Sequence, residues 1–166
     1  MAALPDAESL CGQLARELKA HMTSATAMIG IHTGGAWVAE RLHAALALAE
    51  PLGLLDIAFY RDDYARQGLA KDPKRSKIPF SVEGKHLLLV DDVLYTGRTV
   101  RAAINELFDY GRPASIALVV LAERDGRELP ICAQHSGAKV SVPPGMRLRL
   151  RRDDAGRLSL GLERAA

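Results

Sequence analysis

The sequence predicts an α/β protein with a mostly parallel sheet and helices on both faces of that sheet. Three short apolar runs indicate strands buried on both sides, namely Ala27–Ile31, Leu87–Val90 and Ser115–Leu121. Segments with apolar residues at helical spacing separate these runs, and such alternation is typical of a parallel sheet covered by helices. A chain of 166 residues, 48% of them hydrophobic, suits one domain with one core.

The first half of the chain is expected to supply two helices and two strands. A helix follows Asp6, a residue type that caps helices, and its apolar side chains recur every four residues up to Met22. After the strand at 27–31, a second helix is expected over about 36–49, because the sequence Pro51-Leu52-Gly53 ends it. A further short strand is expected at Ile57–Tyr60.

The second half begins with a helix behind the central strand, and Gly111 is expected to cap it. Residues 123–145 are polar and rich in turn formers, without a clean period. Met146–Arg151 then alternates apolar residues with arginines, and Leu158–Leu162 alternates back, which predicts a two-stranded hairpin. The expected parts of the single domain are therefore a core at about 27–122, a segment at 123–145 and a hairpin at 146–163.

The composition favours a soluble cytoplasmic protein. The formal net charge of +2 is too small to indicate a nucleic-acid-binding protein, although it leaves RNA binding open. Cys11 and Cys132 match no metal or redox spacing and the five histidines are scattered, so no zinc site is expected. The sequence shows neither a signal-peptide pattern nor an apolar run of membrane length, so no membrane association is expected.

The stretch Leu87–Thr99 carries the strongest functional signal. Its apolar residues run straight into Asp91 and Asp92, which are therefore expected at the carboxyl end of a central strand, where open α/β sheets bind ligands. The following Thr96-Gly97-Arg98-Thr99 segment opens a helix, and its amide groups favour an anion. Since two carboxylates would repel a phosphate, they are expected to face hydroxyl groups or a divalent cation. Phosphoribosyl pyrophosphate fits both halves of such a site.

Other interpretations of this stretch are less well supported. An apolar run that ends in two acids also occurs in receiver domains and acid phosphatases, and a Thr-Gly pair after a strand is often only a turn. Receiver domains, however, carry their acids after the first strand, whereas a long segment precedes them here. A P-loop is excluded, because Gly84-Lys85-His86 lacks the upstream glycine and the following Ser or Thr.

A second glycine turn, Thr33-Gly34-Gly35, lies between the strand at 27–31 and the next helix. Amide groups at a helix start favour an anion here too, with a plain strand-to-helix turn as the alternative. Further on, residues 61–81 are too polar to pack and too long for a simple connector. We expect a mobile loop there that could close over the reacting centre, with a solvated loop as the alternative.

Four strings of the sequence resemble the type I phosphoribosyltransferases. The stretch Leu87–Thr99 is similar to the signature of that family, and its form resembles the PyrR branch, whose members are pyrimidine operon attenuation regulators and also uracil phosphoribosyltransferases. The other strings are residues 30–35 (Gly-Ile-His-Thr-Gly-Gly), residues 60–63 (Tyr-Arg-Asp-Asp), and Gly111-Arg112-Pro113 followed by Glu128-Leu129-Pro130-Ile131. The resemblance covers about residues 6–140.

The resemblance implies the type I phosphoribosyltransferase fold, with a small hood at 123–145 that holds the base. It implies that the turn 33–35 receives pyrophosphate, in a loop that often holds a non-proline cis peptide. Several relatives carry Arg in place of Gly34, and its absence weakens the inferred contact with pyrophosphate or RNA. The implied catalytic residues are Asp91, Asp92 and Arg61, the two acids also holding Mg²⁺ indirectly through ribose hydroxyls or water. The implied substrate-binding residues are Thr33, Gly34, Gly35, Asp62, Asp63, Val93, Leu94, Tyr95, Thr96, Gly97, Arg98, Thr99, Arg124 and Arg127.

The implied reaction transfers ribose 5-phosphate from phosphoribosyl pyrophosphate to uracil, giving UMP and pyrophosphate. The resemblance also implies a UMP-sensing regulator that binds pyrimidine operon leader mRNA, and a homo-oligomer, either dimer or tetramer. The alternatives are a purine phosphoribosyltransferase, which shares the central motif, and an enzyme without RNA binding. An outer row of hairpin arginines could meet RNA or a neighbouring subunit, but a solvated sheet face is favoured. The row consists of Arg147, Arg149, Arg151 and Arg152.

Overall fold

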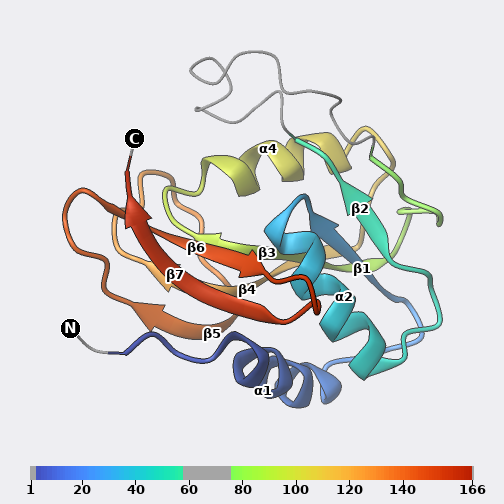
Figure 1. Ribbon diagram of the computed structural model, residues 1–166. Coiled ribbons are helices and arrows are strands. Elements are labelled where there is room, and N and C mark those ends of the chain that lie inside the picture. Colours follow the sequence, from blue (N-terminus) through green and yellow to red (C-terminus); the bar gives the residue numbers. More distant parts are fainter. Residues whose placement is uncertain (1–2, 58–75, 166) are drawn as a thin grey trace.

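A computed structural model describes residues 3–57 and 76–165 of the chain (Figure 1). Five strands form one sheet in the order β2-β1-β3-β4-β5, and every pairing within it is parallel. These strands are β1 (Thr26–Ile31), β2 (Gly53–Leu55), β3 (His86–Leu94), β4 (Ser115–Arg124) and β5 (His135–Val140). The other described elements are helices α1 (Ala7–Lys19), α2 (Gly34–Leu46) and α4 (Arg98–Leu107) and the hairpin strands β6 (Met146–Arg152) and β7 (Leu158–Arg164). The predicted α/β class is confirmed.

Helices cover both faces of the sheet, as predicted (Figure 1). Successive strand residues point to opposite faces, so one strand contributes to two cores. In β3, Leu89 packs on the face covered by α4, whereas Leu88 packs on the face covered by α1, α2 and the hairpin. The core on the second face includes residues from Ala7 to Leu158, so the first helix and the C-terminal hairpin share it with the sheet.

The two helices of the first half begin close to their predicted positions. The carboxylate of Asp6 accepts a hydrogen bond from the amide of Ser9 at 2.9 Å, which confirms Asp6 as the cap of α1. Helix α2 begins at Gly34, two residues before the predicted start. It ends at Leu46, where Ala47 adopts a left-handed conformation with φ 48°. The predicted end of this helix, at residue 49, is therefore three residues too late.

The predicted strand at Ile57–Tyr60 falls mostly on residues 58–60, which lie outside the described residues, and Ile57 itself is not in a strand. The strand that pairs with β1 is Gly53–Leu55, which the sequence did not predict. Residues 135–140, predicted to lie in the hood, instead form the edge strand β5 of the main sheet. Both strands lie at edges and contain a glycine that packs closely on its neighbour, so they carry little of the apolar pattern that marks a buried strand.

The helix after the central strand also ends earlier than predicted. Helix α4 ends at Leu107 with Phe108 as its cap, so Gly111 does not cap it. Gly111 has a φ of 146° and lies in the connection to β4, where its backbone passes close to Glu83. Its positive φ explains the glycine, but the role predicted for it was wrong.

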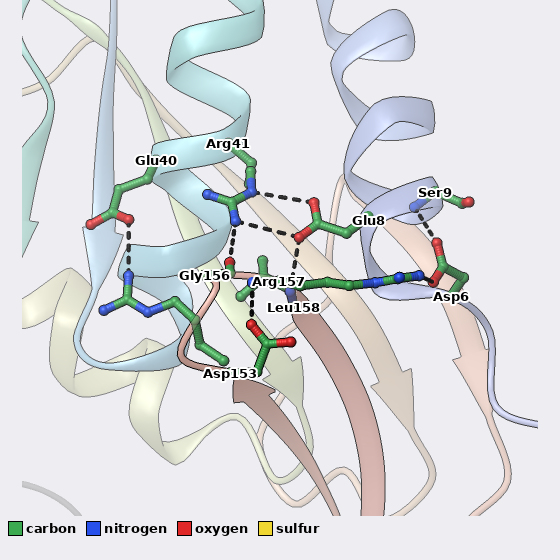
Figure 2. A network of polar contacts seen from close by, with 10 residues as sticks. Asp6, Glu8, Ser9, Glu40, Arg41, Asp153, Gly156, Arg157 and Leu158 are labelled. Carbon is green, nitrogen blue, oxygen red and sulfur yellow. Dashed lines mark hydrogen bonds and ion pairs between the residues drawn. The ribbon is translucent and has the colours of Figure 1, made fainter.

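The C-terminal hairpin forms as predicted, with its leucines inward. Leu148, Leu150 and Leu158 are buried, and the last two pack in the core beside α1 and α2. On the outer face, the carboxylate of Glu163 forms ion pairs with three arginines, so these side chains do not face solvent alone. The distances are 2.8 Å to Arg147, 3.0 Å to Arg149 and 3.3 Å to Arg151. A polar network joins the hairpin turn to α1 and α2 (Figure 2).

Candidate functional site

The turn Thr33-Gly34-Gly35 lies beside the two acids because of how the β3 ladder ends. Pairing of β3 with β1 ends at Gly30 opposite Val90, whereas pairing with β4 continues to Leu94. The strand therefore ends four residues later than predicted, and the two acids lie within it rather than behind it. On the β1 side, however, the ladder stops at Val90, and Gly34 and Gly35 of the turn after β1 lie beside Asp92 and Asp91.

Gly34 and Gly35 lie directly against the two acids. A Cβ atom on Gly34 would come 2.5 Å from the Cγ of Asp92. A Cβ atom on Gly35 would come 2.6 Å from the carbonyl oxygen of Val90 and 2.9 Å from the Cα of Asp91. The turn can thus approach this closely only without side chains at both positions. The cis peptide implied for this loop is present, between His32 and Thr33.

The two acids have different surroundings. Asp91 is 3% exposed, and one of its carboxylate oxygens accepts a hydrogen bond from the amide of Asp92 at 3.0 Å. Asp92 is only half-buried, and its carboxylate lies beside Gly34. Asp92 is therefore the acid whose carboxylate is accessible at the turn, while the Asp91 carboxylate supports the backbone of its neighbour.

The Thr96–Thr99 turn has the geometry of a helix start. Gly97, with φ 94°, is the N-cap of α4, and its carbonyl accepts the first intrahelical hydrogen bond, from the amide of Arg101, at 3.0 Å. The amides in the first turn before Arg101 have no acceptor within the helix, and such groups favour an anion. One of them, the amide of Arg98, donates to the hydroxyl of Thr96 at 3.2 Å.

Val93 and Leu94 connect the acids to this turn within β3. They pair with Ala122 and Glu123 of β4. Leu94 is 1% exposed in the core under α4, so it can present only its main chain to a ligand. Val93 is half-buried.

Arg124 and Arg127 lie against Tyr95, near the end of β4. The Arg124 guanidinium carbon lies 4.0 Å from the centre of the Tyr95 ring. Arg127 donates a hydrogen bond to the carbonyl oxygen of Tyr95 and pairs with Glu123 at 3.0 Å. The structure thus brings Arg124 and Arg127 to the signature stretch. The remaining candidates, Arg61, Asp62 and Asp63, lie outside the described residues, as does most of the predicted mobile loop.

A cavity of about 450 Å³ opens where β4 and β5 end. The carboxyl ends of parallel strands meet at this edge of the sheet, which is the usual position of a ligand site in such folds. Arginines, a lysine and acids line it, so it is polar and carries both signs of charge. The lining residues are Glu123, Arg124, Asp125, Gly126, Arg127, Lys139, Val140 and Ser141.

Residues 128–131 form a part of the site that the functional interpretation did not include. The amides of Glu128 and Leu129 both donate to the carbonyl of Thr96, at 3.0 and 3.1 Å. The carboxylate of Glu128 also pairs with the guanidinium of Arg98 at 2.8 Å. These contacts span about thirty residues of sequence, so no local pattern indicates them; the resemblance of the Glu-Leu-Pro-Ile string was the only available signal.

The described residues supply no complete metal cage. In residues 3–57 and 76–165, no group of three or more His, Cys, Asp or Glu side chains is arranged to hold a metal ion. Within the same ranges, no helix is long and apolar enough to cross a membrane.

Comparison with known proteins defines the class. The family model described as a phosphoribosyl transferase domain matches residues 2–140. In the solved structure of a hypoxanthine phosphoribosyltransferase from Staphylococcus aureus, the matching part covers 81% of this chain and 73% of that chain, with a TM-score of 0.64 and 23% sequence identity. This likeness confirms the predicted phosphoribosyltransferase fold.

Closer relatives identify the branch. The bifunctional protein PyrR of Pseudomonas syringae pv. syringae is 51% identical over 151 residues, which cover 89% of each chain. The bifunctional protein PyrR of Nitrosococcus oceani is 55% identical over 136 residues, which cover 81% of this chain and 77% of the relative. The chain therefore belongs to the PyrR family of phosphoribosyltransferases, as its motifs predicted.

Proposed function

We propose that this protein is a uracil phosphoribosyltransferase and that it also regulates transcription of pyrimidine biosynthetic genes by sensing UMP and binding leader mRNA. The observation that carries the enzymatic half is the contact of Gly34 and Gly35 with Asp92 and Asp91, in a chain of the PyrR family. That contact supports the proposal, because it brings a glycine turn at a helix start close to a half-buried carboxylate. A sugar with one anionic group on its C1 oxygen and hydroxyls nearby matches this arrangement.

In the proposed reaction, the bond between ribose C1 and the pyrophosphate oxygen breaks, and a bond from C1 to uracil N1 forms. The N1 proton is lost to solvent, and the products are UMP and pyrophosphate. Positive charge develops on the ribose ring as the leaving group departs, so catalysis depends on positioning and electrostatics. No side chain has to act as a nucleophile.

The proposed roles of the residues follow from their positions. The Asp92 carboxylate accepts hydrogen bonds from the ribose hydroxyls and stabilises the developing charge, while Asp91 holds the Asp92 amide in place. The Thr96–Thr99 turn binds the 5-phosphate through the amides at the start of α4. The turn 33–35 receives pyrophosphate, and Arg61, outside the described residues, would assist its departure.

Mg²⁺ is the proposed cofactor, and the residues fit it in an indirect role. Mg²⁺ usually keeps several waters and is held by one or two carboxylates together with substrate oxygens, rather than by a full protein cage. One accessible carboxylate, that of Asp92, with Asp91 behind it, matches such a donor set better than it matches a closed site. When bound, the ion would neutralise charge on the leaving pyrophosphate.

The base assay tests the enzymatic proposal. Labelled uracil, guanine and hypoxanthine are each incubated with the protein, phosphoribosyl pyrophosphate and Mg²⁺, and nucleotide formation is measured. UMP formation with uracil alone is expected. Product with the purines would replace the proposal with a purine phosphoribosyltransferase, and no product with any base would leave only a binding role.

The regulatory half rests on the name that relatives of about 50% identity carry, bifunctional protein PyrR. Nucleotide binding would raise RNA affinity if the bound and free forms present the RNA surface differently. Filter binding of the pyrimidine leader transcript, with and without UMP, tests this, and UMP is expected to strengthen binding. Equal, weak and sequence-independent affinity would reject the regulatory role.

A homo-oligomer in the cytoplasm is part of the same proposal. Light scattering coupled to size exclusion measures the mass directly, and a dimer or tetramer of the 17.9 kDa chain is expected. A monomer at all concentrations would contradict it.

A further inference from the structure

The Tyr95 side chain is held on two sides, although it is 44% exposed. The Arg124 guanidinium covers one face of the ring at 4.0 Å from its centre, a distance at which a cation and an aromatic face attract each other. A Cβ atom on Gly126 would collide with the ring edge, so the backbone of Gly126 passes directly beside it. With φ 110°, Gly126 also adopts a conformation that other residues rarely take.

Hydrogen bonds also hold the main chain of Tyr95 and Thr96. The Tyr95 carbonyl accepts a hydrogen bond from Arg127, and the Thr96 carbonyl accepts two, from the amides of Glu128 and Leu129. Gly97 lies so close to Ile131 that a Cβ atom on it would come 3.2 Å from that side chain. The carbonyl side of the turn is therefore fixed to the segment 124–131, and the turn cannot shift without breaking these contacts.

Both arginines are engaged in this support. Arg124 donates to the carbonyl of Met146, the first residue of β6, at 3.2 Å, while its guanidinium covers Tyr95. Arg127 is shared between Glu123 at 3.0 Å and the Tyr95 carbonyl. One donor of Arg124 and two donors of Arg127 have described hydrogen bonds, and these bonds together with the ring contact fix where each guanidinium lies.

We propose that Arg124 and Arg127 are positioning residues, which hold Tyr95 and thereby the 5-phosphate turn, rather than donors to the base. This inference rests on the proposed function and assigns a role within its site. An anion site made of amides needs its backbone fixed before the ligand arrives, because ordering a loosely held turn would cost binding free energy. Arg124 provides that order through the ring of Tyr95, and Arg127 provides it through the carbonyl of the same residue.

The test distinguishes a loss of 5-phosphate binding from a loss of base binding. Arg127→Gln and Tyr95→Leu are titrated with ribose 5-phosphate by calorimetry, and the KM values for uracil and phosphoribosyl pyrophosphate are measured for each. Arg112→Gln is the matched control, because its side chain is exposed and its described hydrogen bonds, with Glu83 and Gly84, involve only its main chain. We expect ribose 5-phosphate to bind about tenfold more weakly to both variants, because Arg127→Gln loses a charged hydrogen bond and Tyr95→Leu loses the contact of the ring with a cation. The KM for uracil is expected to stay unchanged.

A double-mutant comparison tests the contact itself. Tyr95→Leu and Arg124→Gln are measured singly and together, and the combined loss of ribose 5-phosphate affinity is expected to be smaller than the product of the two single losses. Arg124→Lys, which keeps the charge but loses the planar stacking, is expected to recover part of the affinity. Thermal unfolding of every variant identifies any that fails to fold, and the other variants of the set then decide the result.

Three results would overturn the proposal. One is unchanged ribose 5-phosphate binding with a raised KM for uracil, which would make the arginines base contacts. Another is multiplicative losses in the double variant, and the third is an equal loss in Arg112→Gln. The calorimetric measurement needs no base, so it remains informative if the wild-type protein forms no product and the proposed function fails.

Discussion

At the scale of single residues, two adjacent glycines limit how the site can be built. Gly34 lies against the side chain of Asp92, which can turn away, whereas Gly35 lies against the main chain of Val90 and Asp91, which cannot. The same one-carbon addition should therefore have different consequences at the two positions. Sequence alone shows two glycines in a turn and gives no reason to separate them.

Gly35→Ala should lower stability, because its Cβ atom would collide with strand backbone at the centre of the sheet. The expected loss is about 2 kcal/mol, or about 6 °C in Tm. Gly34→Ala should leave the Tm closer to wild type but reduce kcat strongly, since the methyl group would displace the Asp92 carboxylate. Calorimetry and the uracil assay measure both, and equal Tm losses in the two variants would contradict the distinction.

Asp92→Asn should keep the fold and lose most of the turnover. The change is isosteric at a half-buried position, but it removes the charge proposed to stabilise the ribose cation, so kcat is expected to fall about a hundredfold. Asp154→Asn, at an exposed turn position, serves as control. Near-normal turnover in Asp92→Asn would refute the role assigned to this acid.

At the scale of elements, polar contacts fasten the C-terminal hairpin to the first helix (Figure 2). Glu8 of α1 accepts a hydrogen bond from the amide of Leu158 at 2.8 Å and pairs with Arg41 of α2 at 3.2 Å. Arg41 in turn donates to the carbonyl of Gly156 in the hairpin turn at 2.5 Å. One carboxylate therefore joins three elements that lie far apart in the sequence.

This carboxylate should make stability depend on pH. Burial raises the pKa of Glu8, but the hydrogen bonds from Leu158 and Arg41 outweigh that effect and leave the pKa below its ordinary value of 4.5. A carboxyl whose pKa is lowered by folding adds stability above its unfolded pKa, and that contribution is lost as the pH falls through the folded value.

Glu8→Gln should accordingly lower the Tm by a few degrees at pH 7. The difference from wild type should shrink as the pH falls below about 4.5 and the wild-type carboxyl takes up its proton. Thermal unfolding from pH 3 to pH 7 measures this. A difference that is constant across the range would show that the charge of Glu8 contributes nothing.

At the scale of the whole molecule, the two turns of the proposed site are parts of the elements that form the two cores. The turns at 33–35 and 96–99 each begin a helix, and α2 and α4 lie on opposite faces of the sheet, where each packs into a different core. A ligand that bridges the two turns would therefore tie both cores together. Its binding should raise the stability of the whole domain rather than of one loop.

Phosphoribosyl pyrophosphate with Mg²⁺ should raise the Tm accordingly. At about a hundred times its Kd, a ligand that binds only the folded state adds about 2.7 kcal/mol, which corresponds to about 8 °C for a chain of this size. Free ribose at the same concentration lacks both anionic groups and should cause no shift. Differential scanning measures both, and an equal shift with ribose would contradict anion recognition.

The sequence by itself determined the alternation of strands and helices, the hairpin and the two glycine turns at the starts of α2 and α4. These features depend on neighbouring residues: apolar runs in β1, β3 and β4, the cap at Asp6, and glycines at helix starts. They could be predicted because periodicity and capping act over one or two turns of chain. The resemblance added the family, which the relatives of about 50% identity confirm.

Only the tertiary structure decided how these parts meet. It separated the buried Asp91 from the accessible Asp92, placed β5 in the sheet, and set Arg124 and Arg127 on Tyr95. Each of these results depends on groups that are distant in the sequence. The pairing of β3 with β1 stops before the acids, β5 joins the sheet through its pairing with β4, and Arg124 at the end of β4 covers the ring of Tyr95. Local residue patterns carry no information about such distances, because the packing of the folded chain alone fixes them.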